Sequence, residues 1–327
     1  LIEGPADAKK LASSFTADTL NIVAAGTDSD TKGDFNVTAA LDGISGQSSG
    51  TMVDTTDMAQ ALRDGFAINS TIAYTASKFD FASNTPEGKP TKMTGTSKGG
   101  DLTVEMNQDR LKYAANANAA AFSLTSADIP LPSIDVSYDE AAFNLEMPLA
   151  KSETPADFAF LTRLVGLTVS EPVWAMIDPT GALPHDGATL IIDAKGKATV
   201  QSDIFANMED DMSTPPSGEL NALDLSELRF SIAGAELTGN GALTFDNTDM
   251  TTFSGMPLPT GKVDLKLTGA NTLLDKIVEM GYLSQDDVMG YKMMAGMFTN
   301  SAPDKDELTS TLEFKDKGFY ANGQKLQ

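Results

Sequence analysis

The chain has 327 residues, of which 41% are hydrophobic, and a formal net charge of −23. That hydrophobic share supports a folded core and argues against global disorder, while the acidity disfavours binding to nucleic acid or to anionic membrane surfaces. The absence of cysteine excludes disulfides, thiolate metal sites and cysteine nucleophiles, and no apolar run approaches the ~20 residues that a membrane helix needs.

The start of the chain carries no positively charged, apolar and small-residue pattern of a signal peptide. It begins with Leu1 rather than methionine, so we expect a processed or trimmed form of a longer protein whose signal was lost upstream. The lack of cysteine fits a cytosolic protein and an exported Gram-negative protein equally well.

Alternation of apolar and polar residues with a period of two dominates the chain and predicts β-strands. In chain order the predicted strands lie at 34–42, 102–106, 111–113, 134–138, 143–147, 190–192, 198–200, 228–232, 237–245, 263–267 and in two segments of 308–323. Turns are predicted at 107–110, 193–196 and 316–318, and at the pair Asn322-Gly323. One-sided alternation is typical of antiparallel sheets that pack on one face and meet water on the other.

Short helices are predicted between the strands. Thr154 and Pro155 supply an N-cap and a first-turn proline for a helix whose apolar stripe runs from Phe158 to Val165. Further helices are expected at 57–66, from 171, from 271 to 281 and from 284 to about 298. The fold class is therefore mainly β: a large antiparallel twisted sheet or sheets, arranged as a sandwich or a curved groove, with about four to five short covering helices.

The acidic, proline-containing segment 207–218 is the best candidate for a linker. We expect an N-terminal β-rich part over 1–150 and a C-terminal β-rich part with short helices over 151–327, or one continuous domain truncated at its N-terminus. The terminal hairpin is expected to complete a sheet, with Leu308, Leu312 and Phe314 on the packed face.

A methionine-rich segment is the strongest candidate for a binding surface. Methionines at helical spacing usually pack in a core, and they also line soft apolar surfaces that bind varied ligands. The alternatives here are core packing and a hydrophobic ligand-binding wall. The residues concerned are Met289, Met293, Met294, Met297 and Phe298.

Signals for catalysis are weak. Ser48 fits a G-x-S-x-G pattern, but the sequence around it does not read as the buried strand and following helix that a nucleophile elbow needs. His185, the one histidine, is expected in an exposed loop, with a general-base role beside Asp186 as the alternative. Trp174 is expected to hold its short helix on the sheet, with a ligand anchor as the alternative.

Metal and cofactor sites are not expected. The segment 28–34 resembles a calcium loop but lacks an oxygen ligand at Lys32 and an acid at Ala39, so a hairpin turn is the preferred interpretation. The run Glu209-Asp210-Asp211 is interpreted as a solvated loop rather than an ion site.

Three longer stretches resemble a known family. The segments "SETPADFAFLTRLVGLTVSEPVWAMIDPTGALP", "GELNALDLSELRFSIAGAELTGNGALTFDNTDMTTF" and "DELTSTLEFKDKGFYANGQKLQ" are similar to an uncharacterised family of exported alphaproteobacterial proteins, domain of unknown function 2125. "GISGQSSG" and "ALRDGF" in the first half fit as well. The resemblance implies a secretion signal upstream and carries no activity or functional residues.

A weaker resemblance links the closing strands to AsmA-like envelope proteins, which are long curved β-sheets, several of them implicated in lipid handling. The segments "LTGNGALTFD", "GKVDLKLTG" and "LEFKDKGFYANGQKL" carry it.

Together these features lead us to expect a non-enzymatic periplasmic or otherwise exported envelope protein. It would bind or carry a lipid or other hydrophobic ligand in a β-sheet groove. The alternative is a structural or assembling surface protein that pairs its sheets with an envelope partner, and a hydrolase that uses Ser48 or His185 is a distant third.

Overall fold

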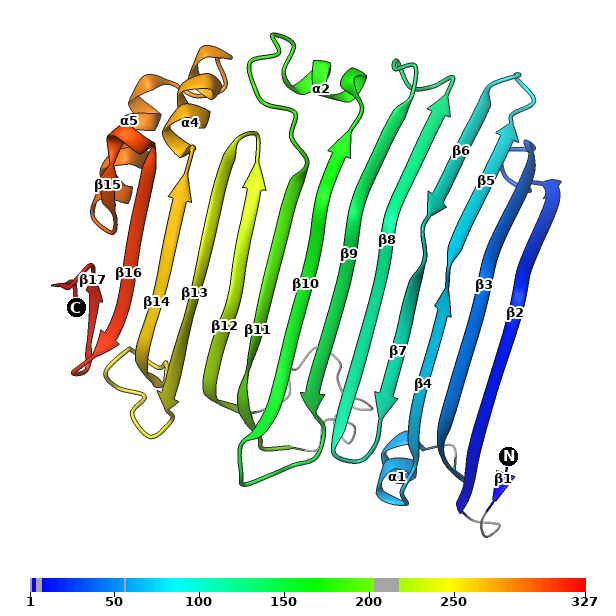
Figure 1. Cartoon of the computed structure of the whole chain (residues 1–327), viewed down its shortest axis with the longest axis horizontal. Helices are drawn as coiled ribbons and strands as arrows, with labels where there is room; N and C mark the ends of the chain where they lie inside the picture. The colour runs from blue at the N-terminus through cyan, green and yellow to red at the C-terminus, as the bar shows by residue number, and fades with distance from the viewer. Residues whose placement is uncertain (1, 4–7, 56, 203–217) are drawn as a thin grey trace.

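The computed structural model describes residues 2–3, 8–55, 57–202 and 218–327, which form one large antiparallel sheet with short helices at its two ends (Figure 1). The strands are β1 (Ile2–Glu3), β2 (Ala8–Thr27), β3 (Asp34–Val53), β4 (Ala67–Tyr74), β5 (Ala76–Asn84), β6 (Pro90–Ser97), β7 (Gly100–Met106), β8 (Arg110–Ser126), β9 (Ile134–Pro148), β10 (Ala156–Val169), β11 (Ala188–Val200), β12 (Gly218–Ile232), β13 (Ala235–Asp246), β14 (Leu258–Thr268), β15 (Asn300–Ala302), β16 (Glu307–Lys315), β17 (Gly318–Ala321) and β18 (Gln324–Lys325). The described helices are α1 (Met58–Arg63), α2 (Glu171–Ile177), α4 (Ala270–Glu279) and α5 (Gln285–Gly296), with a short 3₁₀ turn at Pro303–Lys305. The prediction of a mainly β, antiparallel fold with a few short helices is confirmed.

The sheet is a meander in which the long strands follow one another in chain order. The strands β4 and β5 lie end to end and together pair with β3, and β6 and β7 pair in the same way with β8. From β8 to β14 each strand pairs with the next, and β14 then pairs with β16. Because β9 pairs with β10, the sheet is continuous across residue 150.

The two edges of the sheet differ. At the C-terminal edge β15 and β17 both pair with β16, and β18 pairs with β17. The turn between β16 and β17 has positive φ at Asp316 and Lys317 (50° and 56°), as two-residue hairpins prefer. At the N-terminal edge the two described residues of β1 pair with Lys10 and Leu11 of β2.

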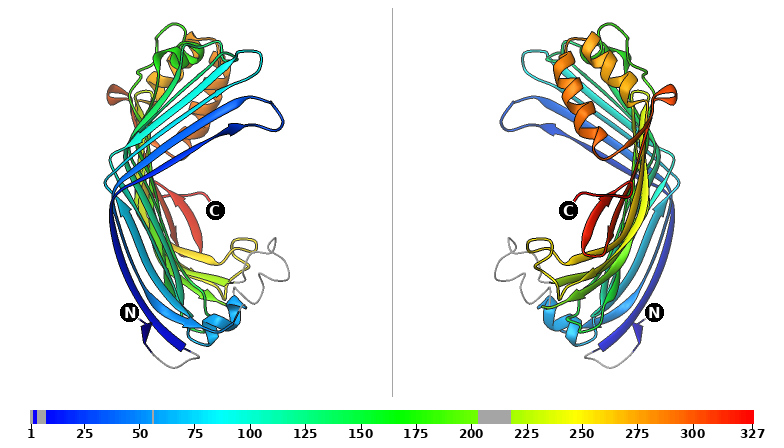
Figure 2. Two further views of the ribbon diagram at one scale, coloured as in Figure 1. Left: turned by 90° about the vertical axis from the view of Figure 1, so that its right-hand side faces the viewer. Right: turned by 90° about the vertical axis from the view of Figure 1, so that its left-hand side faces the viewer.

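A line of bends crosses the strands near mid-length and folds the sheet into an open trough (Figure 2). Positive φ values occur there at Gly43 in β3 (58°), Gly99 between β6 and β7 (107°), Ala119 in β8 (45°) and Gly166 in β10 (68°). A Cβ on Gly99 would lie 2.9 Å from the carbonyl oxygen of Tyr74. Glycine is therefore required at this bend both by its φ and by the approach of a neighbouring strand.

The two faces of the sheet differ in chemistry. Directly paired residues share a face, and one face collects aromatic and aliphatic side chains across β2–β17. We call this set the apolar concave face: Phe15, Leu20, Ile22, Val37, Phe79, Phe81, Leu102, Tyr113, Phe122, Phe143, Leu145, Phe160, Ile192, Leu223, Phe230, Leu243, Leu265, Leu312 and Phe314.

The apolar face stays on one side of the sheet on both sides of the bend. Ser97, above the bend in β6, donates a hydrogen bond to the Tyr74 hydroxyl, below the bend in β4, at 3.1 Å. Burial at this point, with a smaller contribution from Tyr74, raises the pKa of Tyr138. The helices α4 and α5 and the loop after β13 lie toward the inner side of the trough in Figure 2.

Charged pairs cover the opposite, convex face. Arg110 contacts Glu105 and Glu146, at 2.5 and 3.3 Å. Arg163 contacts Glu140 at 3.6 Å and Glu227 at 3.8 Å. These exposed pairs contribute little stability individually, so the convex face is primarily a water-facing surface.

Two predictions of local structure are wrong. The segment 154–165 was predicted as a helix, but its residues from Ala156 onward belong to β10, and the predicted turn 193–196 lies inside the unbroken strand β11. The strands β10 and β11 pair with each other over these residues, Phe158 opposite Gly196 and Leu161 opposite Asp193. Pairing on both edges thus overrides the proline cap and the glycine-containing turn signal.

The other predicted helices are present. Asp57 caps α1 by accepting from the backbone N–H of Gln60 at 3.1 Å. Ser284 and Asp287 form a reciprocal capping box at the start of α5. Within the sheet the hairpin of β16 and β17 places Leu308, Leu312 and Phe314 on the apolar face, as predicted. The predicted linker 207–218 lies, apart from Gly218, outside the described residues.

Candidate functional site

The apolar concave face is left partly open because the described residues form a single sheet with no second layer over it. Phe15, Ile22, Phe122 and Phe230 remain 51, 49, 45 and 43% exposed. The total accessible surface is 19161 Å², against about 13,000 Å² expected for a compact monomer of this mass. Large exposed apolar surfaces of this kind mark binding sites.

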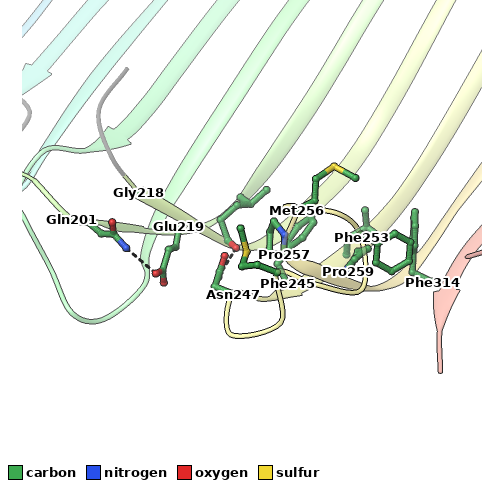
Figure 3. Close-up of a pocket in the computed structure, with 13 residues that line it drawn as sticks. Gln201, Gly218, Glu219, Phe245, Asn247, Phe253, Met256, Pro257, Pro259 and Phe314 are labelled. Atoms are coloured by element: carbon green, nitrogen blue, oxygen red, sulfur yellow. Dashed lines mark hydrogen bonds between the residues drawn. The ribbon is translucent and has the colours of Figure 1, made fainter. Parts of the chain in front are cut away.

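A pocket lies at the C-terminal end of the trough, and we call it the end pocket (Figure 3). It has a volume of about 710 Å³, within the ~300–1,000 Å³ range of small-molecule sites. Strands β12, β13, β14 and β16 supply its floor, and the loop 247–257 supplies a wall. The lining residues are Gln201, Gly218, Glu219, Leu220, Leu243, Phe245, Asn247, Met250, Phe253, Met256, Pro257, Pro259 and Phe314.

Phe253 anchors the loop 247–257 to the floor. Its side chain is 7% exposed and its ring meets Phe314 edge-on at 5.7 Å between centroids. Phe314 in turn stacks on Phe319 at 5.0 Å. These three rings close the pocket on the side of β16 and β17, since aromatic contacts of this geometry are favourable beyond simple burial.

Asp249 fixes the loop from the other side. It accepts hydrogen bonds from the backbone N–H groups of Thr251 and Thr252, at 3.2 and 3.1 Å. Its second oxygen accepts from Lys317 Nζ, in the β16–β17 turn, at 2.8 Å. The bond from Lys317, followed by those from Thr252, lowers the pKa of Asp249 well below its ordinary value. The loop is therefore tied to the terminal hairpin by a carboxylate that stays charged.

The polar groups of the end pocket lie at its rim and bond to each other or to the backbone. Gln201 donates to Glu219 at 2.7 Å, and Asn247 donates to the carbonyl of Leu220 at 2.9 Å. None of the lining residues that the structure describes is a lysine, arginine or histidine. The pocket thus offers apolar contact rather than a cation for a charged ligand.

A second hollow of about 400 Å³ adjoins the end pocket. It is lined by residues of β9, β10 and β11, with Phe158, Phe160 and Leu145 among them, and it shares Gly218, Glu219 and Leu220 with the end pocket. We call these two adjoining hollows, which together extend across the strands from β9 to β16, the channel.

The methionine-rich segment lies on α5 and does not line the end pocket. Met289, Met293, Met294 and Met297 are 64, 72, 55 and 61% exposed, so the core-packing alternative is wrong for them. Phe298 is 37% exposed, and its carbonyl accepts a hydrogen bond from the buried Ser310 of the apolar face at 2.6 Å. This last contact places the end of α5 on the concave side.

His185 lies in a small cluster beside α2. Its ring stacks on Trp174 at 4.4 Å, and its Nδ1 lies 3.1 Å from Glu171. Asp178, which is 2% exposed, accepts from the backbone N–H of Leu183 at 2.6 Å, and this bond lowers its pKa to about 2. His185 is therefore a half-buried packing residue rather than an exposed loop residue, and Trp174 stacks on it.

The other sequence signals for chemistry do not assemble into a site. Ser48 lies inside β3 with Ser13 and Ser70 as its cross-strand neighbours, so no strand-to-helix elbow surrounds it. The segment 28–34 is the β2–β3 turn, in which Asp28 accepts from the backbone of Asp30 and Thr31 at 3.0 and 2.7 Å. The run 209–211 lies outside the described residues.

Over the described ranges, no group of three or more His, Asp or Glu side chains is placed to hold a metal ion. None of the helices described is long and apolar enough to cross a bilayer.

Sequence reasoning missed the end pocket. Its aromatic residues, Phe245, Phe253 and Phe314, are far apart in the chain, and only the pairing of β13, β14 and β16 brings them together. The segment Met256-Pro257-Leu258-Pro259 was the available signal, because two prolines mark a rigid loop between apolar strands.

Comparison with known proteins gives a family and no closer relative. The model of the family described as "Uncharacterized protein conserved in bacteria", domain of unknown function 2125, matches residues 71–323. No curated protein and no solved structure matches the chain.

Proposed function

The chain belongs to this family of uncharacterised bacterial proteins, and we propose that it binds a lipid or another hydrophobic ligand in its β-sheet trough, as a non-enzymatic exported protein of the cell envelope. The observation that carries the proposal is the open apolar concave face. A folded chain that leaves rings such as Phe15 and Phe122 about half exposed gains apolar burial, at roughly 25 cal/mol per Å², when a ligand covers them.

Three further features support a binding role. The concave face is continuous across the bend, the end pocket has an apolar floor and wall, and its rim polar groups are already hydrogen-bonded. The similarity of the closing strands to AsmA-like envelope proteins supports the exported location. The methionines of α5 remain candidate contacts for the ligand at the mouth of the trough.

Native mass spectrometry of the protein purified from its own envelope, followed by denaturation and organic extraction, tests the proposal. We expect a lipid-sized mass that is released on denaturation. A bare chain mass, together with no uptake of long-chain alkylphosphocholine by the purified protein, would contradict it.

The exposed edge of β2 favours a second function, assembly through sheet pairing with an envelope partner. From Ser13 onward, no described strand pairs with the outer edge of β2. From Ser13 to Thr27 this strand contains one charged residue, Asp18, and no proline, although exposed edges are usually protected by such residues. A strict monomer in size measurements at micromolar concentration would exclude self-assembly through this edge.

A further inference from the structure

We propose that the channel between β9 and β16 binds a single aliphatic chain laid across the strands, with the methyl end of that chain in the end pocket beneath the loop 247–257. The inference rests on the proposed hydrophobic-ligand function and specifies its ligand class and orientation.

The length of the channel fits a chain-like ligand. The two hollows meet at Gly218, Glu219 and Leu220 and together extend over seven strands, β9–β14 and β16. At about 4.8 Å per strand spacing this extent is about 29 Å. One leaflet of a bilayer's hydrocarbon core is about 15 Å thick, so an extended acyl chain fits lengthwise.

The chemistry of the end pocket sets the orientation. Among the described residues that line it, the one charged side chain is Glu219, a carboxylate that repels phosphate or carboxylate head groups. Lys317 of the terminal hairpin donates its hydrogen bond to Asp249 of the loop 247–257. An anionic or zwitterionic head group therefore finds no cation in the lining, whereas a methyl end finds three phenylalanine rings and two methionines.

The loop 247–257 gives the channel a fixed end. Phe253 is buried against Phe314, and the Asp249–Lys317 ion pair holds the loop on the hairpin. The methionines of α5 do not contribute to either hollow. The end pocket therefore sets how far a chain can enter, independently of α5.

Photo-crosslinking of the full chain tests the orientation. Two isomers of a long-chain alkylphosphocholine are used, one with a diazirine at the terminal carbon and one with a diazirine beside the head group. We expect the terminal isomer to label residues 245–259 and the head-side isomer to leave them unlabelled.

A pair of matched variants tests the site. Met256 in the pocket wall and Met176 on α2 are 62 and 63% exposed, so both tolerate a charged replacement. We expect Met256→Glu to weaken alkylphosphocholine binding about tenfold or more, because it places an unpaired carboxylate against the chain, and Met176→Glu to leave binding unchanged.

The outcomes separate the two proposals. If the wild-type chain binds neither probe, the proposed hydrophobic-ligand function is wrong, and the inference that rests on it is wrong as well. If both isomers bind but label other regions, or if only Met176→Glu weakens binding, the ligand function stands and the end-pocket assignment is overturned. Should Met256→Glu fail to fold, the labelling pattern of the wild-type chain decides alone.

Discussion

Asp249 has a structural role that most of the chain's acidic residues do not share. Many carboxylates lie on the convex face in exposed pairs, whereas Asp249 joins two separate parts of the chain, the loop 247–257 and the terminal hairpin. The side chain of Asp249 is 13% exposed and that of Lys317 is 68% exposed, so the hydrogen bonds to Asp249 are better protected from water than those of a typical surface pair.

Replacement of Asp249 by Asn tests this role through its pH dependence. The folded-state pKa of Asp249 lies below its ordinary value of 3.8, so its contribution to stability is present above that pH and is lost as the pH falls below it. We expect D249N to melt at a lower temperature than the wild type at neutral pH, and the gap to narrow in acid. Thermal unfolding followed by circular dichroism over a pH series measures this.

Two controls accompany that measurement. Lys317→Met should reproduce the loss at neutral pH, since it removes the partner of Asp249, while Asp18→Asn in the exposed β2 should change little. A gap between wild type and D249N that stays constant into strong acid would show that the charge of Asp249 is not the cause.

The surroundings of individual side chains were the least predictable feature of the structure. The methionines of α5 have helical spacing, and such spacing does not reveal which face of a helix meets the sheet. Trp174 and His185 stack on each other because the α2–β11 connection folds back over the helix. No local pattern reports a contact of that kind.

At the scale of elements, alternation predicted most strands, and capping signals predicted α1, α2, α4 and α5. The strands β2, β4, β5 and β6 were not predicted. The two wrong predictions share one cause: β10 and β11 carry local helix and turn signals but pair on both of their edges. A strand in the middle of a sheet is stabilised by two neighbours, which outweighs a weak local preference. The trough shape depends on glycines at the bend, whose alignment across strands depends on register.

Gly99 tests the importance of the bend. Its φ of 107° and the 2.9 Å approach of the Tyr74 carbonyl oxygen to an added Cβ both oppose any side chain. Gly88, in the β5–β6 hairpin, has a φ of 76° and open space around it. We expect Gly88→Ala to lower the free energy of unfolding by about 1 kcal/mol and Gly99→Ala to lower it by about 3 kcal/mol or more, as measured by urea denaturation. Equal losses would mean that the close approach at the bend is unimportant.

The whole molecule is held together almost entirely by contacts between neighbouring strands. A single sheet without a second layer buries less surface than a compact protein of the same mass, as the 19161 Å² of accessible area indicates. Sequence patterns predicted one-faced strands correctly but could not choose between a sandwich and a groove. Both arrangements need the same alternation, and they differ only in what covers the apolar face.

Because each strand of the sheet contacts mainly its two neighbours, unfolding can begin at one edge of the sheet. In repeat-like structures, stability is approximately a sum of local terms, and opening can begin at an end without loss of the rest. The C-terminal edge of this sheet is covered by β15, β17 and β18, whereas, among the described residues, β1 covers β2 at Lys10 and Leu11. Opening should therefore start at β2.

Hydrogen exchange of the native protein measures this directly. We expect the slowest amide exchange in β9–β12, which have long partners on both sides, and progressively faster exchange through β3 to the outer edge of β2. The exchange rate of an amide should depend on the position of its strand in the sheet, because the hydrogen bonds of each strand open together. It should not depend on whether the side chain lies on the concave or the convex face. Uniform protection from β2 to β16 would instead show that the sheet unfolds as one cooperative unit. That result would require a stabilising contact on the concave face, such as a ligand retained through purification.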